Sequence, residues 1–290
     1  MIRKRIFSME HKHLDLSQIK VVAVDLDGTS INHAHELEDY TAKVYNALPQ
    51  AGVELIVATG RGKNDVSMLK KLTIPFTLVT YNGSVIAKPE TLGYQRPLDP
   101  QALVQICNYP YDADLYVSFY TADHWYVNQH NEAYARKLTS SGSAFEFKEA
   151  TACVNEPVVK VFIVDPTGDR DRLELIKKDL EAKIGDKVEA VFSGNMSLDF
   201  TAKGVNKLTA IEAYLQSKGL TASENLIAFG DSMNDYAMLT GAKYGFYMEN
   251  TLPFIKENFV PHPNCHEIGN CYKLATAKFL NQIFALGIQE

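Results

Sequence analysis

The sequence predicts an α/β protein with a three-layer core on a parallel sheet, into which an α+β domain is inserted. Apolar strand-like runs alternate with helical segments at the start of the chain and again after Gly204. This spacing is typical of βαβ units with right-handed crossovers. Between these regions, from about 87 to 200, aromatic strand-like segments predominate. The length of 290 residues is also well above the usual domain of ~100–150 residues.

The first part of the chain has the pattern of three strands separated by two helices. Residues 19–24 and 53–58 are short apolar runs that end in polar loops, as buried strands do. A third strand is expected at 76–79. Helical spacing of apolar residues predicts a helix over 37–48, and a second helix is expected around 64–72.

The middle segment predicts a separate cap domain of strands and helices. Alternating aromatic and apolar residues indicate its strands. The expected strands are 114–120, 124–128, 158–164, 187–192 and 197–200, and the expected helices are 100–108 and 169–183.

The earlier pattern returns after Gly204, so the sheet domain is discontinuous in sequence. A helix is expected at 207–217, a strand at 226–229 and a helix at 234–239, and 274–288 has the spacing of an amphipathic helix. The predicted organisation is a polar extension at 1–18, a core formed by 19–86 and 201–290, and a cap domain at 87–200.

Composition and charge exclude several classes of protein. With 46% hydrophobic and 22% charged residues, the chain is far from the composition of disordered proteins. Its net charge is -6, so neither nucleic acid nor an anionic membrane is an expected partner. The four cysteines are too few for a disulfide scaffold, and no apolar run reaches the ~20 residues that span a bilayer. We therefore expect a cytoplasmic protein.

Acidic and polar side chains follow three of the predicted strands. They are Asp25 and Asp27 after the first strand, Thr59 after the second, and Asp231, Asn234 and Asp235 after the strand at 226–229. Because the carboxyl ends of parallel strands share one edge of a sheet, these groups should converge. An aspartate can act as a nucleophile toward a phosphoryl group. Asp25 and Asp231 also offer the hard oxygen ligands that Mg²⁺ prefers.

An aspartate followed by glycine after a strand also has an ordinary structural interpretation, because this pair is common in turns. A single DxDG segment is a turn more often than a catalytic site. Here four segments with functional groups follow one another in order, and this agreement favours a catalytic site.

The four segments are DLDGT at 25–29, ATGR at 58–61, GVNK at 204–207 and GDSMND at 230–235. They resemble the four ordered motifs of the haloacid dehalogenase superfamily of phosphohydrolases. The insert between ATGR and GVNK, together with YNGS at 81–84, is similar to the Cof-type branch. The resemblance implies a Rossmann-like core with a cap of the α/β (C2) type.

The resemblance also implies a role for each motif residue. Asp25 would be the nucleophile that becomes an aspartyl-phosphate, and Asp27 would be the general acid to the leaving group and then the base for water. Thr59 would hydrogen-bond a phosphoryl oxygen, and Lys207 would offset negative charge on the phosphoryl group. Three further residues would contact the phosphate or the leaving group: Gly60, Arg61 and Asn82.

The cofactor implied by the resemblance is Mg²⁺. Its ligands would be the side chain of Asp25, the backbone carbonyl of Asp27 and the side chain of Asp231. Asn234 and Asp235 would support this metal site.

Some residues depart from the family pattern or have competing interpretations. Ser30 stands where Leu is usual, and Leu208 stands where Gly is common, but neither change removes a functional group. A zinc site is conceivable at His262, Cys265, His266 and Cys271. Their spacing matches no standard zinc finger, and isolated cysteines are usually small buried hydrophobes. Packing is likewise favoured over substrate contact for the cap residues His124, Trp125, Tyr126 and His130.

The leading hypothesis is a Mg²⁺-dependent phosphatase that acts on a small phosphorylated metabolite, with a sugar phosphate as the favoured class. A phosphomutase that uses the same aspartyl-phosphate is an alternative. A phosphometabolite-binding regulator without activity is another. The presence of both Asp25 and Asp27 favours an enzyme, because a binding protein has no need of the acid–base carboxylate. The sequence predicts neither the individual metabolite nor the oligomeric state.

Overall fold

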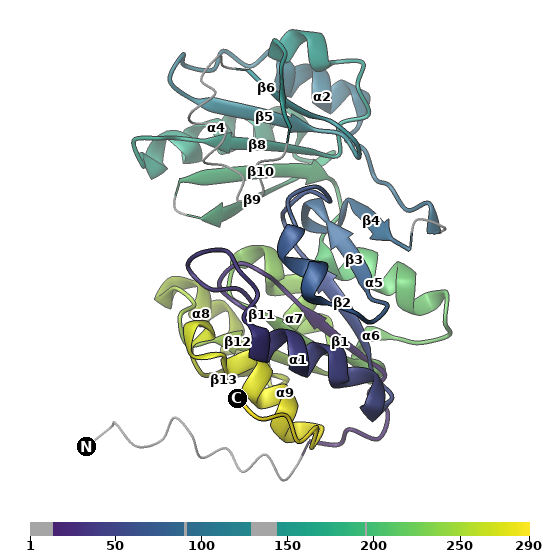
Figure 1. The fold of residues 1–290 in the computed structure, drawn as a ribbon. Helices are drawn as coiled ribbons and strands as arrows, with labels where there is room; N and C mark the ends of the chain where they lie inside the picture. Colours follow the sequence, from purple (N-terminus) through teal and green to yellow (C-terminus); the bar gives the residue numbers. More distant parts are fainter. Residues whose placement is uncertain (1–13, 90–91, 129–143, 195) are drawn as a thin grey trace, which may run out of the picture. The chain divides into compact units, whose positions relative to one another are not determined.

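The computed structural model describes residues 14–89, 92–128, 144–194 and 196–290, which form two compact units (Figure 1). Of the described residues, those up to Ala58, Met68–Thr77 and Ile211–Glu290 form the first unit, and those within Thr59–Ser67 and Leu78–Ala210 form the second. Most of the predicted polar extension, 1–18, lies outside the described residues. The second unit contains the predicted cap domain together with some residues of the predicted core, such as 59–67 and 201–210. These units are defined differently from the predicted domains, so the predicted domain boundaries stay a prediction.

The helices and strands alternate in the first third of the chain and again in its last third, as the sequence predicts. In chain order they are β1 Val21–Val24, α1 Asp39–Ala47, β2 Glu54–Ala58, β3 Thr77–Thr80, β4 Val85–Lys88, α2 Pro100–Cys107, β5 Tyr116–Tyr120, β6 Trp125–Val127, β7 Glu146–Phe147, β8 Lys160–Val164, α4 Arg170–Ile184, β9 Val188–Gly194, β10 Ser197–Ala202, α5 Lys207–Gln216, α6 Ala222–Asn225, β11 Leu226–Gly230, α7 Tyr236–Gly241, β12 Tyr244–Met248, α8 Pro253–Phe259, β13 Cys265–Ile268 and α9 Ala275–Ile283.

The first unit contains five parallel strands in the order β13-β12-β11-β1-β2. Val21 of β1 pairs with Leu226 of β11 on one side and with Glu54 of β2 on the other. All four residues of β1 are buried, because helices cover both faces of a parallel sheet.

The connections of this sheet run in opposite directions from its centre. The chain passes from β1 through α1 to β2, and from β11 through α7 to β12. Right-handed crossovers therefore place α1 and α7 on opposite faces, and Figure 1 shows this arrangement. The carboxyl ends of β1 and β11 mark the point where the strand order reverses, which is where open α/β sheets bind ligands.

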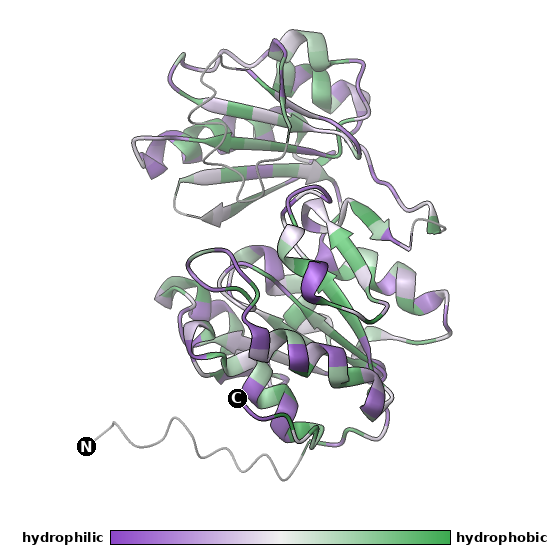
Figure 2. Ribbon diagram, viewed as in Figure 1, coloured by the Kyte–Doolittle hydropathy of each residue, from purple (hydrophilic) through white to green (hydrophobic). Residues whose placement is uncertain are grey.

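The second unit contains a six-stranded sheet in the order β7-β6-β5-β8-β10-β9. Its neighbouring strands are antiparallel except for β6 and β7. Side chains of α2, α4 and the sheet share one hydrophobic core, which includes Leu103, Leu173 and Phe200. Strands β3 and β4 form an antiparallel pair. Figure 2 shows hydrophobic residues concentrated in the strands of both units, whereas the helices carry many hydrophilic ones.

Most of the predicted elements are confirmed within a few residues, but one helix is wrong. The helix expected around 64–72 is a single 3₁₀ segment, Ser67–Lys71. Residues 63 and 64 are in a turn just before it, and the N–H of Leu72 donates to the carbonyl of Leu69 at 3.0 Å, the i to i+3 bond of the tighter 3₁₀ helix. Strands β4, β7, β12 and β13 and helices α6 and α8 were not predicted. No helix in the described ranges is long and apolar enough to cross a membrane.

Candidate active site

The DLDGT and GDSMND segments meet in the first unit at the carboxyl ends of two paired strands. Asp25 follows β1 and Asp231 follows β11, and these strands run parallel in register. The backbone N–H of Asp25 donates to the carbonyl of Phe229 at 3.0 Å, which extends the ladder beyond β1. Asp25 is buried, with 6% of its surface exposed. The predicted convergence of these two motifs is therefore confirmed.

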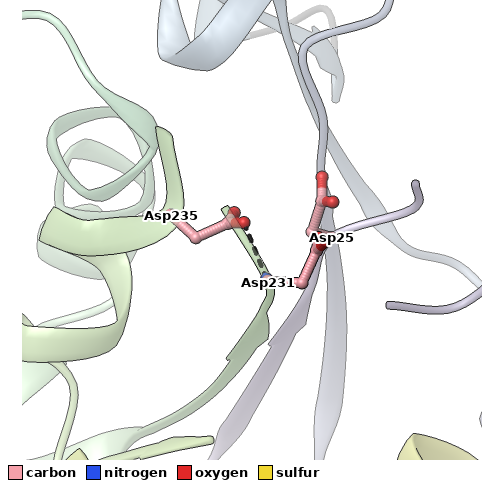
Figure 3. Close-up of side chains that lie close together, drawn as sticks. All are labelled: Asp25, Asp231 and Asp235. Carbon is pink, nitrogen blue, oxygen red and sulfur yellow. Dashed lines mark hydrogen bonds between the residues drawn. The ribbon is translucent and has the colours of Figure 1, made fainter. Parts of the chain in front are cut away.

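Three carboxylates form a cluster at this position. One oxygen each of Asp25, Asp231 and Asp235 lies within 4.8 Å of the others, and no other such group of three His, Cys, Asp or Glu ligands occurs among the described residues (Figure 3). Carboxylates this close repel one another unless a cation or a proton neutralises them. Hard oxygen donors of this kind fit Mg²⁺, which binds through one or two carboxylates together with water and phosphate oxygens.

Within the cluster, Asp235 is held by the backbone of its own loop. Its Oδ2 accepts the N–H of Asp231 and the N–H of Ser232, each at 3.0 Å. Figure 3 shows Asp235 pointing back at Asp231 along the first of these bonds. A Cβ on Gly230 would lie only 2.4 Å from Cγ of Asp235, so glycine is needed at 230. Asp235 thus fixes the loop that carries Asp231, and Asn234 lies beside it, accepting a hydrogen bond from Ser232 Oγ at 2.8 Å.

The DLDGT loop is shaped to approach Asp231 closely. Gly28 has φ +72, and a Cβ there would lie 2.2 Å from Oδ2 of Asp231. Thr29 donates its hydroxyl to Oδ1 of Asp231 at 3.3 Å. The side-chain amide of Asn250 donates to the carbonyl of Gly28 at 2.8 Å, and its oxygen accepts the N–H of Cys271 at 2.9 Å. The carboxy-terminal part of the chain therefore supports the loop, a role that sequence reasoning missed.

Replacing Gly28 with alanine should damage both stability and activity. A left-handed conformation costs a residue with a Cβ about 1–2 kcal/mol, and the new methyl group also collides with Asp231. Gly52→Ala is the matched control, because Gly52 has φ +71 with nothing within 4 Å. Both variants should lose melting temperature, but only Gly28→Ala should lose activity. Equal activity of the two variants would contradict the close approach.

Asp27 is more exposed than Asp25. Its side chain is 48% exposed, and Oδ1 lies 3.4 Å from Nδ1 of His35. On the same side, the ring of His33 stacks on Tyr272 with centroids 3.6 Å apart, and burial raises the pKa of Tyr272. The predicted acid–base carboxylate is thus accessible to a leaving group and to water.

Ser30, which departs from the family pattern, binds the backbone behind the predicted nucleophile. Its hydroxyl donates to the carbonyl of Asp25 at 2.5 Å and lies 2.8 Å from the hydroxyl of Tyr45. Tyr45 is fully buried, and this burial raises its pKa. Serine at this position therefore makes hydrogen bonds behind the DLDGT loop that a leucine could not make.

The remaining motifs meet in the second unit. Thr59 follows β2 directly and is fully buried. Its N–H donates to Val79, its carbonyl accepts the N–H of Asn82 at 3.1 Å, and its hydroxyl accepts the N–H of Arg61 at 3.1 Å. The guanidinium of Arg61 pairs with Asp65 at 3.3 Å. ATGR and YNGS therefore form one hydrogen-bonded pair of loops.

The GVNK segment packs against YNGS. Gly83 has φ +100, and a Cβ there would lie 2.0 Å from the carbonyl oxygen of Asn206 and 2.9 Å from the nitrogen of Lys207. Lys207 is the first residue of α5, and its side chain is fully buried. The second unit thus gathers Thr59, Asn82 and Lys207 from three separate parts of the chain.

The candidate zinc ligands and the cap residues that the sequence singled out mostly contact neighbouring protein groups. The ring of His262 lies 2.8 Å from the Tyr236 hydroxyl, and the Cys265 thiol faces the carbonyl of Leu239 at 3.6 Å. Trp125 and Tyr126 are buried, whereas His124 is exposed beside Glu146. His130 lies outside the described residues.

Known proteins resemble the chain over most of its length. Residues 22–259 match the family of haloacid dehalogenase-like hydrolases. An HMP-PP phosphatase of Cronobacter sakazakii is 29% identical over 260 residues, which cover 89% of this chain and 93% of the relative.

Two solved structures share the fold. A haloacid dehalogenase-like hydrolase from B. subtilis has a TM-score of 0.77 at 21% identity and covers 91% of this chain and 99% of its own. A sugar phosphatase of HAD subclass IIB has a TM-score of 0.76 at 19% identity, with 92% and 99% covered. The chain therefore belongs to the haloacid dehalogenase-like hydrolases, in the Cof-type branch of phosphatases that its motifs indicate.

Proposed function

We propose that the protein is a Mg²⁺-dependent phosphatase that hydrolyses a small phosphorylated metabolite through an aspartyl-phosphate on Asp25. The observation that carries this proposal is the carboxylate cluster of Asp25, Asp231 and Asp235 at the carboxyl ends of paired parallel strands. Asp27, two residues after the nucleophile and partly exposed, supplies the second carboxylate that this chemistry needs.

The reaction takes place in two steps. A carboxylate oxygen of Asp25 attacks phosphorus, the bond from phosphorus to the leaving oxygen breaks, and Asp27 donates its proton to that oxygen. Asp27, now a carboxylate, then takes a proton from water while the water oxygen attacks phosphorus and the bond from phosphorus to the Asp25 oxygen breaks. Inorganic phosphate leaves, and Asp25 and the protonated Asp27 are restored.

The metal ligands we propose are the side chains of Asp25 and Asp231 and the backbone carbonyl of Asp27, with Asp235 and Asn234 in support. Bound there, Mg²⁺ would neutralise charge on the phosphoryl oxygens and on the carboxylates around them. A supporting role suits Asp235, because its Oδ2 already accepts hydrogen bonds from two backbone N–H groups.

We assign phosphate binding to the loops of the second unit. Thr59 donates its hydroxyl to a phosphoryl oxygen, and Lys207 offsets negative charge, a task that suits a fully buried ammonium group. Gly60, Arg61 and Asn82 contact the phosphate or the leaving group.

A sugar phosphate is the substrate class that we favour. One support is the fold, which the chain shares with a sugar phosphatase. Another is the relative named HMP-PP phosphatase, whose name also gives a phosphatase activity. In enzymes generally, a domain that closes over an active site restricts the size of the substrate and excludes water.

The experiment that tests the proposal is a screen of phosphorylated metabolites for phosphate release, with and without Mg²⁺. Mg²⁺-dependent release from one class of metabolite is expected. Turnover that requires a bisphosphate primer and releases no phosphate would indicate a phosphomutase. Binding without turnover would indicate a regulator, and either result would overturn the proposal.

Asp231→Ala should raise the Mg²⁺ concentration for half-maximal activity by about tenfold or more. The change removes one of few anionic ligands, and even supporting residues of a metal site are typically worth ~10–100-fold in affinity. A Mg²⁺ titration of phosphate release measures the effect. Asp39→Ala, at an exposed residue of the same unit that pairs with Lys71, serves as the control. Identical titrations of the two variants would contradict the assignment.

A further inference from the structure

A buried polar network joins the phosphate-binding loops to two strands of the insert, within the second unit. The side-chain amide of Asn82 donates to Oδ2 of Asp199 at 2.6 Å. The ammonium group of Lys160 lies 3.0 Å from the same oxygen and donates to the carbonyl of Gly60 at 3.2 Å. Lys160 begins β8, and Asp199 lies in β10 beside it, where Asp199 pairs with Phe162. One ion pair of the insert therefore reaches both YNGS and ATGR.

The burial of this pair is nearly complete. The side chains of Lys160 and Asp199 are 6% and 2% exposed. Burying two charges costs more than their attraction returns unless further hydrogen bonds satisfy both groups. A pair that served stability alone could be replaced by apolar residues of similar size. The contacts of the Lys160–Asp199 pair with Asn82 and Gly60 indicate that it also holds these two loops.

The carboxylate of Asp199 is also bound in an uneven way. Both bonds go to Oδ2, and the buried Oδ1 has no hydrogen-bond partner among the residues that the structure describes. An unsatisfied buried oxygen is rare and calls for an explanation. The orientation of the carboxylate thus favours the contacts with Asn82 and Lys160 over full hydrogen bonding.

Asn82 itself needs support, because its backbone is in the left-handed region. Tyr81 and Asn82 have successive φ angles of 52 and 57. Residues other than glycine keep this backbone conformation only when their surroundings fix it. The bond from the side chain to Asp199 provides that fixation from outside the loop.

We propose that Asp199 and Lys160 are positioning residues for the reaction: Asp199 orients Asn82, and Lys160 holds the Gly60 carbonyl. The inference rests on the proposed function, because it assigns Asn82 to the phosphate or the leaving group. The insert then contributes to catalysis through these two side chains, in addition to any selection of substrate.

The test compares Asp199→Ala and Asn82→Ala singly and together, with p-nitrophenyl phosphate and Mg²⁺ as the assay. Misplacing a reacting group by about 1 Å can cost ~10²-fold, so each single variant should lose about 10- to 100-fold in kcat/KM. The double variant should lose little more than the worse single one, because the two residues act as a unit. Losses that multiply would overturn the proposal.

Asp165→Ala is the matched control. Asp165 is also a buried carboxylate of the second unit and pairs with Arg172 at 3.2 Å, but it follows the last residue of β8, at the opposite end from Lys160. This variant should melt at a lower temperature while its kcat/KM stays within about threefold of the parent. A loss in Asp165→Ala as large as in Asp199→Ala would show that the effect is only structural. If Asp199→Ala does not fold, the isosteric Asp199→Asn replaces it, with a smaller loss expected.

A second readout does not depend on turnover. The side-chain amide signal of Asn82 in ¹H–¹⁵N NMR spectra, assigned by its loss in Asn82→Ala, should shift in Asp199→Ala and stay in place in Asp165→Ala. A signal unmoved in Asp199→Ala would overturn the positioning role. An inactive parent protein with the expected shift would instead refute the phosphatase proposal and leave the positioning of Asn82 intact.

Discussion

Asp25→Asn is expected to abolish turnover while leaving the fold and substrate binding largely unchanged. Asparagine has nearly the same size and shape as aspartate, so it fits this buried position, where Asp25 is only 6% exposed. An amide is a very poor nucleophile toward phosphorus, so no covalent intermediate can form at this position. The variant also removes one negative charge from the cluster with Asp231 and Asp235, which should not lower stability.

Phosphate release and melting temperature should be measured on the same preparation. Asp39→Asn, the same chemical change at an exposed aspartate of the first unit, should keep the activity of the parent. Activity of Asp25→Asn within about tenfold of the parent would refute the nucleophile, because loss of a group that forms the intermediate must cost far more.

Asp27→Asn should lower the rate by about 10²–10⁴-fold, the usual contribution of a positioned acid or base. Its side chain is 48% exposed, so the change should alter the melting temperature very little. The effect should depend on the substrate, since a leaving group that is itself acidic departs without a proton.

Rates for an aryl phosphate with an acidic leaving group and for an alkyl phosphate separate these possibilities. For formation of the aspartyl-phosphate, Asp27→Asn should lose clearly less of the parent's rate with the aryl phosphate than with the alkyl phosphate. An equal deficit for both substrates would contradict the role of Asp27 as the acid.

The sequence predicts the central strands well because their physical signal is strong. β1 is a continuous apolar run and β2 is apolar after its first residue, Glu54, and both begin and end within two residues of the prediction. β13, with the sequence CHEI and only one buried residue, has neither an apolar run nor alternation, and it was missed. The segment around 64–72 differs in another way: it does form a helix, but a 3₁₀ helix limited to Ser67–Lys71 that follows a turn at 63–64.

The candidate site was predictable where its side chains directly follow neighbouring parallel strands. Asp25, Asp231 and Asp235 could be placed together because paired parallel strands bring their loops to one edge. Lys160 and Asp199 were not predictable, since they stand inside ordinary strand patterns and their contacts with Gly60 and Asn82 depend on tertiary packing.

The central position of β1 has a consequence for how the chain is made. Its two neighbours are β2, which follows soon after it, and β11, which pairs through Leu226 near the end of the chain. At ~5–20 residues per second, a nascent β1 waits on the order of ten to forty seconds for β11. During that time one edge of the strand has unpaired backbone groups, a template for wrong pairing with other chains. The centre of this sheet is therefore expected to form only late in synthesis, and a chain shortened before β11 loses that centre together with Asp231.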